Sequence, residues 1–351
     1  MNIKSLLIGS AALATVSTGA QAADAIVVAD PEPMDYVRIC DVYGAGFFYI
    51  PGTETCLKIG GYVRYSIFLG HNDGLGTAAT RTPGSGTKQA RFAPNFDVRS
   101  DTSIGTVRAY AELEIDWDWG TRAGIVAGAP AAVTGYGLDI AMPWAHIDII
   151  RGSHTWRFGR AHSPYARFLG YGAPILYNAD YGFSNTSEIS YTFSGSNGFQ
   201  FIAALQEDDA DWAPDGILGV NFVRGWGHIG AIAGYDSSAG TFGVKGVSGF
   251  NFGNSGVSAE LHVFYSSGAG DFAINDPVTG AVATWSVLGS LSAKFSPKAT
   301  GTIAAHWFDT GVFYAAANVA FNVAPGLAVT PKIGYVSNGD LIGSIRIQRS
   351  F

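Results

Sequence analysis

Charged side chains stand at alternate positions in several segments of this chain, with apolar residues between them. Arg64 lies between Val63 and Tyr65, and Arg108 and Glu112 lie in a second segment of the same kind. Charges that line one surface beside water set up an electric field that acts on ions and dipoles. The chemistry that this spacing favours is therefore electrostatic selection, rather than the making or breaking of a bond.

A reaction centre is the alternative interpretation. His162 and Ser163 are neighbours, but adjacent residues of a strand point to opposite faces, so adjacency does not make them a base and its nucleophile. No Gly-x-Ser-x-Gly motif occurs in a strand–turn–helix setting, and the glycine run 243–249 lacks a following helix and a lysine placed to bind phosphate. A barrel-type outer-membrane phospholipase stays an alternative, and no cofactor or metal is expected.

Strands are the elements that would hold such charges on one surface. Successive side chains of a strand face opposite sides of the sheet, so residues 57–67 would place Arg64 on one face and an apolar set on the other. The same alternation recurs in 107–115, 257–265 and 285–295. Because a half-buried strand of a soluble sheet shows it too, the alternation predicts strands but not their surroundings.

The gaps between the strands are short and long in turn. Sixteen strands are expected near residues 57–68, 90–100, 105–115, 140–151, 154–160, 187–193, 199–206, 216–224, 227–235, 241–251, 256–265, 284–295, 299–308, 312–323, 327–336 and 341–351. The even-numbered gaps are short, whereas the long gaps 69–89, 116–139, 161–186 and 266–283 fall on odd counts. Short turns at one end and long loops at the other are typical of outer-membrane barrels.

The composition agrees with strands that meet lipid on one face. Of the 351 residues, 47% are hydrophobic and 14% are charged, and 47 are glycines. A typical soluble domain has about 25% charged residues. No stretch long and apolar enough for a membrane-spanning helix is found. We predict an all-β fold, a transmembrane antiparallel barrel of about sixteen strands. A soluble glycine-rich β protein is the alternative.

The first residues carry an export signal. Lys4 precedes an apolar run at 6–16 and a small-residue cleavage site at 20–22, which is the layout of a secretory signal peptide. Residues 1–22 are therefore expected to be removed. The net charge of −7 at pH 7 argues against nucleic-acid binding.

Two cysteines, Cys40 and Cys56, lie near the start of the mature chain. Behind a signal peptide, two close cysteines most simply form a disulfide. The expected organisation is a periplasmic segment with this disulfide at 23–56, followed by the barrel at 57–351.

Two stretches resemble a known family. The stretch from Arg38 to Tyr65, RICDVYGAGFFYIPGTETCLKIGGYVRY, resembles the N-terminal signature of the alphaproteobacterial general porins. The final residues IRIQRSF, which end on Phe351, resemble the closing strand that barrel-assembly machinery recognises. The resemblance implies a homotrimer of sixteen-stranded barrels in the bacterial outer membrane, in contact with lipid and lipopolysaccharide. It also implies passive diffusion of small hydrophilic solutes; a substrate-specific channel is the alternative.

In this family the third long loop narrows the channel by folding inward, so the constriction is expected at 161–186. Asp180 is the acidic residue of this loop, Glu188 follows it, and Arg167 lies within it. The expected pore-lining residues are Arg64, Arg99, Arg108, Glu112, Arg160, Arg167, Asp180 and Glu188. Arg64, Arg99 and Arg108 would form a basic wall opposite the loop.

The alternative is that these three arginines only form ion pairs with neighbouring carboxylates along the wall. Asp97, Glu112 and Glu114 are the partners expected for them. A separate acidic patch, Glu207, Asp208, Asp209 and Asp211, lies in an expected outer loop. It is more simply a solvated loop than a site for cations that bridge lipopolysaccharide. Outward aromatic residues would form interfacial girdles; they are Trp144, Trp156, Tyr191, Phe201, Tyr235, Phe321 and Tyr335.

Overall fold

Antiparallel strands make up nearly all of the regular structure. The structure is a computed structural model and describes residues 38–69, 86–123, 132–173, 184–208, 212–276 and 278–351. The expected signal peptide and Asp180 lie outside the described residues.

The first eleven barrel strands follow one another directly along the chain. They are β2 (Cys56–Leu69), β3 (Gly86–Thr102), β4 (Gly105–Ala123), β5 (Ala132–Arg151), β6 (His154–His162), β7 (Asn185–Ser194), β8 (Phe199–Gln206), β9 (Asp215–Arg224), β10 (Gly227–Asp236), β11 (Thr241–Asn251) and β12 (Val257–Ser266). After a short hairpin come β15 (Trp285–Ser296), β16 (Ala299–Phe308), β17 (Phe313–Ala324), β18 (Leu327–Val336) and β19 (Leu341–Ser350).

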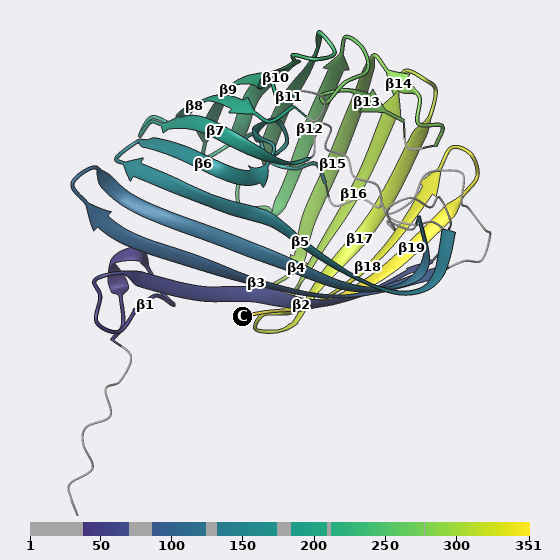
Figure 1. Cartoon of the computed structure of the whole chain (residues 1–351). Coiled ribbons are helices and arrows are strands. Elements are labelled where there is room, and N and C mark those ends of the chain that lie inside the picture. The colour runs from purple at the N-terminus through teal and green to yellow at the C-terminus, as the bar shows by residue number, and fades with distance from the viewer. Residues whose placement is uncertain (1–37, 70–85, 124–131, 174–183, 209–211, 277) are drawn as a thin grey trace, which may run out of the picture. The chain divides into compact units, whose positions relative to one another are not determined.

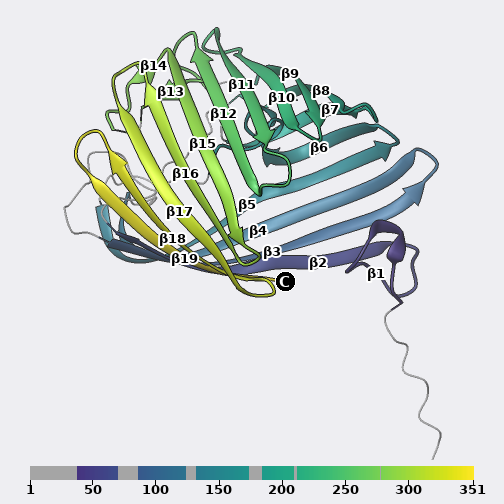
Figure 2. The ribbon, with the colours of Figure 1, turned by 180° about the vertical axis from the view of Figure 1, so that it is seen from behind.

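Each of these strands pairs with the next in antiparallel register, and β19 pairs with β2 from Gly343↔Leu69 to Ser350↔Tyr62. Within the described residues, sixteen strands therefore close on themselves, as Figures 1 and 2 show from opposite sides. Closure leaves no unpaired strand edge, which is the condition for crossing lipid with strands. The predicted fold class is confirmed.

The two faces of the wall differ as the alternation predicts. In β2, the side chains of Val63 and Tyr65 point outward and are 51% and 40% exposed. Ser66, the residue after Tyr65, points inward and is buried. The exposed large hydrophobic residues recur at outward positions around the barrel, for example Leu218 in β9 and Ile303 in β16. An outward apolar face with a polar interior is the pattern of a transmembrane barrel.

Three strands are longer than the sequence predicts. The expected loop at 116–139 is largely strand, because β4 and β5 stay paired out to Ala123↔Ala132. Asp116 and Asp118 look like loop residues in the sequence, but both are inward positions of β4 where a carboxylate meets the polar side of the wall. The turns between β3 and β4 and between β5 and β6 are short, as expected.

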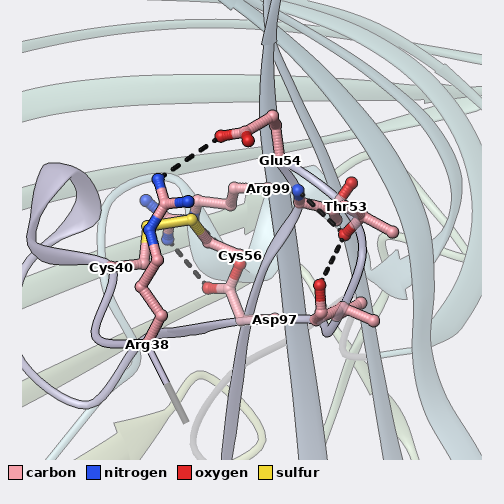
Figure 3. Close-up of a disulfide and its surroundings, with 9 residues drawn as sticks. Arg38, Cys40, Thr53, Glu54, Cys56, Asp97 and Arg99 are labelled. Atoms are coloured by element: carbon pink, nitrogen blue, oxygen red, sulfur yellow. Dashed lines mark hydrogen bonds and ion pairs between the residues drawn. A yellow bond between two sulfur atoms is a disulfide. The ribbon is translucent and has the colours of Figure 1, made fainter. Parts of the chain in front are cut away.

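The segment before the barrel is tied to it by the predicted disulfide. A 3₁₀ turn η1 (Asp41–Tyr43) and a two-residue strand β1 (Phe48–Tyr49) precede β2, and β1 pairs with the start of β2. Cys40 and Cys56 form a disulfide, with a Cα–Cα distance of 6.0 Å, beside Arg99 and Asp97 of β3 (Figure 3).

Two long connections contain structure of their own. The one after β6 begins with a single helical turn, α1 (Pro164–Arg167), whose N-cap is Ser163. The one after β12 contains a small hairpin of β13 (Ile274–Asn275) and β14 (Val282–Ala283). In the part of the chain that the structure describes, no helix is long and apolar enough to cross a membrane.

Candidate functional site

The connection after β6 lies against the inner wall of the barrel. Tyr165 and Leu169 are 1% and 3% exposed and form one apolar cluster with inward residues of β8 to β11. Those wall residues are Ile202, Ala204, Ile217, Ile232 and Val247. Because these positions face away from lipid in the strand register, the third long loop folds inward, as predicted.

A buried lysine fixes this loop from the wall. Lys245 in β11 is fully buried, and its Nζ donates to the carbonyl oxygens of Ala166 at 2.8 Å and Gly170 at 3.3 Å. Ala166 belongs to α1 and Gly170 follows three residues after its end, so the ammonium group satisfies acceptors that the helix turn leaves open. Gly230 in β10 makes room for the loop, since a Cβ there would lie 2.5 Å from Leu169.

Ion pairs connect the inner side chains of β3, β4 and β5. Asp97 in β3 accepts hydrogen bonds from Arg99 at 2.8 Å and from Arg108 of β4 at 3.0 Å. Arg108 also reaches Asp148 of β5 at 3.2 Å. Arg99 and Arg108, expected to face the channel, lie on the inner wall with their charge already paired.

The same network continues to the inward loop. Asp148 is 2% exposed at its side chain and accepts from Arg157 of β6 at 2.8 Å. Glu188 of β7 is fully buried at its side chain, lies 3.9 Å from Arg157, and binds Arg167 of α1 at 2.6 Å. Arg167 and Glu188 are therefore anchors of the loop, and they hold it on the β6–β7 side as Lys245 holds it on the β11 side.

A second ion cluster lies further along β3 and β4. Arg91 binds Asp116 through two parallel hydrogen bonds of 2.7 Å and also pairs with Glu114. The hydroxyl of Tyr62 in β2 donates to the same Glu114 at 3.2 Å. The bidentate geometry fixes the direction of the guanidinium group, so this arginine is as firmly placed as those of the first network.

Arg64 differs from the other arginines of this wall. Its Nε donates to the amide oxygen of Gln348 at 2.9 Å, and its guanidinium lies 4.5 Å from the ring centre of Tyr62. Among the described residues, no carboxylate lies within ion-pair distance of it. The cations nearest to it on the inner wall are Arg346 of β19 and Arg91 of β3.

Glu112 resembles Arg64 in having a polar partner but no ion pair within the described part of the chain. It lies at an inward position of β4, half-buried, and accepts a hydrogen bond from Tyr110 at 3.0 Å. None of the ion pairs between described residues includes it. Two of the expected lining residues thus lie on the inner wall with polar rather than ionic partners.

Arg160 does not lie where it was expected. It pairs with Ser187 across β6 and β7, whereas Glu188 and Gly159 pair one position away. The register therefore places Arg160 on the outward side with Trp156 and Phe158, near the loop end of the strand. The alternation of β6 runs unbroken from Trp156 through Gly159 to Arg160, so Arg160 falls on the same side as these aromatic residues.

Trp144 also departs from the expectation. Its ring lies 6.3 Å from Tyr110 and 4.6 Å from His162, both measured between ring centres, and it pairs with inward Glu112. Trp144 is therefore an inner-wall residue, because a register shift near Glu114 moves the alternation of β5 by one position. Trp156, Tyr235, Phe321 and Tyr335 are exposed on the outer face as predicted.

The acidic residues beyond β8 stabilise turns. Asp208, Asp215 and Asp236 are buried with carboxylate oxygens within 4.8 Å of one another. Asp215 accepts from the backbone of Ser237, and Asp236 from the backbone of Ala239. These bonds give the carboxylates a structural role. Asp209 and Asp211 of the same patch lie outside the described residues.

Sequence reasoning missed Arg91, Asp148 and Arg157, which carry much of the ionic network. Each lies at the same alternate positions as the arginines that were identified: Arg91 pairs with Arg64, and Asp148 pairs with both Arg108 and Arg157. The signal was present as alternation, and extending it strand by strand would have found all three.

A closed barrel with an apolar outer face, a charged inner wall and an inward loop defines an outer-membrane channel. Residues 24–344 match the family described as Porin subfamily, and the chain belongs to that family. "Porin Omp2b" of Brucella abortus is 35% identical over 385 residues, which cover all of both chains. "Porin Omp2a" of Brucella ovis is 36% identical over 363 residues, 97% of this chain and 99% of the relative.

Solved structures agree with the fold. The outer membrane channel DcaP of Acinetobacter baumannii superposes with a TM-score of 0.60 at 15% identity, over 86% of this chain and 99% of that one. A triple mutant of the Rhodopseudomonas blastica porin has a TM-score of 0.56 at 15% identity, over 84% of this chain and all of that one. The protein is an outer-membrane porin channel.

Proposed function

We propose that this porin passes small hydrophilic solutes and ions by passive diffusion, along the charged wall formed by β2 to β7, and that Arg64 sets its ion preference. The observation that carries the proposal is the contrast between Arg64 and its neighbours. Arg91, Arg99 and Arg108 each touch a carboxylate, whereas Arg64 touches an amide and an aromatic ring. A paired charge has much of its field cancelled by its partner, but Arg64 keeps its field for the channel water.

Glu112 would be the opposing pole of that field. It lies on β4, two strands from Arg64, and its own partner is the neutral hydroxyl of Tyr110. A cation and an anion that face the same water without neutralising each other order dipolar solutes as they pass. Arg167 and Glu188, by contrast, neutralise each other at the base of the loop and are proposed only to position it.

A substrate-specific channel is the second candidate within the same class, whereas the phospholipase alternative loses its support. The hydroxyl of Ser163 is buried, donates to Gln206 at 2.7 Å and accepts from the amide of Tyr165. His162 is paired instead with the hydroxyl of Tyr171 at 2.6 Å. This serine caps α1 and is not presented to a substrate, so we propose a channel rather than an enzyme.

The assembly proposed is a homotrimer in the outer membrane, surrounded by lipid and lipopolysaccharide and inserted by the barrel-assembly machinery. The exposed apolar outer face and the porin relatives support it. For the closing strand, the backbone of Phe351 exchanges two hydrogen bonds with Gly61, at 3.0 and 3.2 Å, so the last residue is fixed beside β2. Residues 1–22 are proposed to be a cleaved signal peptide and 23–56 a periplasmic segment.

Reconstitution in a planar bilayer tests the ion preference. Arg64→Gln is expected to shift the zero-current potential in a salt gradient toward cations, because it removes an unpaired cation from the wall. Arg99→Gln is the matched control: its charge is already offset by Asp97, so the shift should be smaller. Equal shifts in the two variants would contradict the assignment to Arg64, and a folded protein without conductance steps would contradict the channel.

A further inference from the structure

The long connection between β12 and β15 also folds into the barrel. Ile274 and Ala283 of the β13–β14 hairpin are each 1% exposed. They pack against apolar inward residues of β12 and β15 to β19, which are Phe264, Leu288, Ala304, Phe308, Tyr314, Val336 and Ile342. Figures 1 and 2 both place the hairpin beside the ends of β12 and β15. An apolar inner wall facing water would be costly, so the hairpin acts as its cover.

The hairpin is fixed at its base by Ser266, the last residue of β12. The hydroxyl of Ser266 donates to the carbonyl of Ala283 at 2.8 Å and accepts from the amide of Ile274 at 3.3 Å. Before the hairpin, the amide of Asp271 donates to Asp236 of β10 at 2.8 Å. The segment is thus bound to both β12 and β10.

Phe272 joins this segment to the inward loop after β6. Its ring centre lies 5.0 Å from that of Tyr165, and it belongs to the same buried cluster as Leu169. The wall is shaped to receive it: a Cβ at Gly234 would lie 2.6 Å from the Phe272 ring, and a Cβ at Gly243 would lie 2.7 Å from its Cβ. Two strands therefore carry glycine where Phe272 lies against them.

Residues 272–274 connect the two apolar clusters of the interior. Phe272 packs in the cluster that holds α1, and Ile274 packs in the cluster under the hairpin. Ala173, near the end of the described part of the inward loop, packs against the second cluster. The two inward segments touch each other as well as the wall, so a displacement of one has to move the other.

We propose that the β13–β14 hairpin is a second constriction element, and that Phe272 is the positioning residue that locks it to the α1 loop. Together the two segments cover the apolar wall from β8 to β19 and leave the charged wall from β2 to β7 as the solute path. Without Phe272 the α1 loop keeps Lys245 and Glu188 but loses its contact with the β13–β14 segment at Tyr165, so it gains freedom to move.

Single-channel recording with two variants of opposite effect tests the inference. Phe272→Ala removes the ring and leaves a cavity between the two segments, so we expect a larger open conductance, by about 1.5-fold, and more frequent closures. Gly234→Ala places a methyl group where the ring lies and pushes it into the lumen, so we expect a smaller conductance. Gly246→Ala is the matched control on β11, since a Cβ there meets nothing within 4 Å.

The outcomes separate this inference from the channel function itself. Wild type and Gly246→Ala should conduct alike, which shows that the pore is intact in the assay. Opposite changes in Phe272→Ala and Gly234→Ala, with near-normal conductance in Phe272→Leu, support the lock. Wild-type conductance and closure in both variants would overturn it. If Phe272→Ala fails to insert, Gly234→Ala decides alone: unchanged conductance in that variant rejects the proposal.

Discussion

The inner wall of this barrel has two parts that differ in their side chains: one is charged and the other is largely apolar. From β3 to β7, most inward charges are paired, and Asp97, Asp148 and Glu188 link neighbouring elements in this way. From β8 to β19, many inward residues near the loop ends are apolar and are covered by inward chain, as at Ile232 and Phe308. The inner wall can therefore be charged, with most of its charges paired, or apolar where a loop covers it.

We call the charged part, β3 to β7, the paired wall, and the apolar part, β8 to β19, the covered wall. The two parts are expected to have different functions. The paired wall is cross-linked, because Arg108 binds carboxylates of two strands, Asp97 of β3 and Asp148 of β5. The covered wall provides shape, since its loops occupy space that water and solutes would otherwise fill. Charge selection is expected from the first part and size selection from the second, so variants in the two parts should change different properties.

The largest effect is expected at Asp148, the carboxylate on which the paired wall depends. Asp148→Asn removes the shared partner of Arg108 and Arg157, so that Arg108 keeps only Asp97 and Arg157 keeps only the 3.9 Å contact with Glu188. Losing one member of a buried ion pair costs about 3–5 kcal/mol. Urea unfolding in detergent, followed by tryptophan fluorescence, measures the loss.

Glu54→Gln is the control for this variant. Glu54 pairs with Arg38 on the surface, where the glutamate side chain is 82% exposed, and such a pair contributes about 0–1 kcal/mol. If Asp148→Asn were no less stable than Glu54→Gln, the idea that ion pairing holds the β3–β7 wall would have to be abandoned.

A smaller effect is expected at Lys245, the buried cation of the covered wall. Lys245→Met keeps most of the side-chain volume but leaves the carbonyls of Ala166 and Gly170 without their donor. Leaving buried acceptors unsatisfied costs about 1–3 kcal/mol. The free energy of unfolding should fall by this amount, and current noise should rise because the α1 loop is less firmly held. Lys294→Met, at an exposed position of β15, should change neither property.

The amino-acid sequence was sufficient to predict the strands of the barrel, because their pattern repeats. The period of two, applied from β2 to β19, predicts the strand order, nearly all boundaries and the inward side of Arg64, Arg99 and Arg108. The expectation for Arg160 departs from this period, which places the residue outward with Trp156 and Phe158. The period itself fails at Trp144, where a register shift between β4 and β5 moves the alternation by one position. A bulge is a local backbone event that the residue types around it do not announce.

The inward β13–β14 hairpin was not predicted from the sequence, for a different reason. Phe264 and Leu288 occupy inward positions in strands whose other inward residues are polar, for example His262 and Ser286. Apolar residues at these positions indicate that something covers them, and the long gap at 266–283 was the nearest candidate. The contact between Phe272 and Tyr165, in contrast, joins two loops far apart in sequence. No periodic pattern predicts such a pair.

The smallest effect is expected from lowering the pH, which should act on the hairpin that covers the apolar wall. Asp276 lies in the turn between β13 and β14, where its carboxylate accepts from the amides of Val278 and Thr279 at 2.9 and 2.7 Å and from the hydroxyl of Thr279. Burial acts to raise the pKa of Asp276, but these hydrogen bonds outweigh it and lower the pKa below its usual value.

Because the pKa of Asp276 is lower in the folded turn than in the unfolded chain, the charged carboxylate stabilises the turn at neutral pH, and this contribution disappears as the pH falls through the folded-state pKa. Closures of the channel are therefore expected to become more frequent at acid pH. Asp276→Asn should show frequent closures already at neutral pH, with a weaker dependence on acid. An acid response identical in wild type and Asp276→Asn would assign it to the carboxylates of the paired wall instead, where Asp97 and Asp148 face the channel side of β3 and β5.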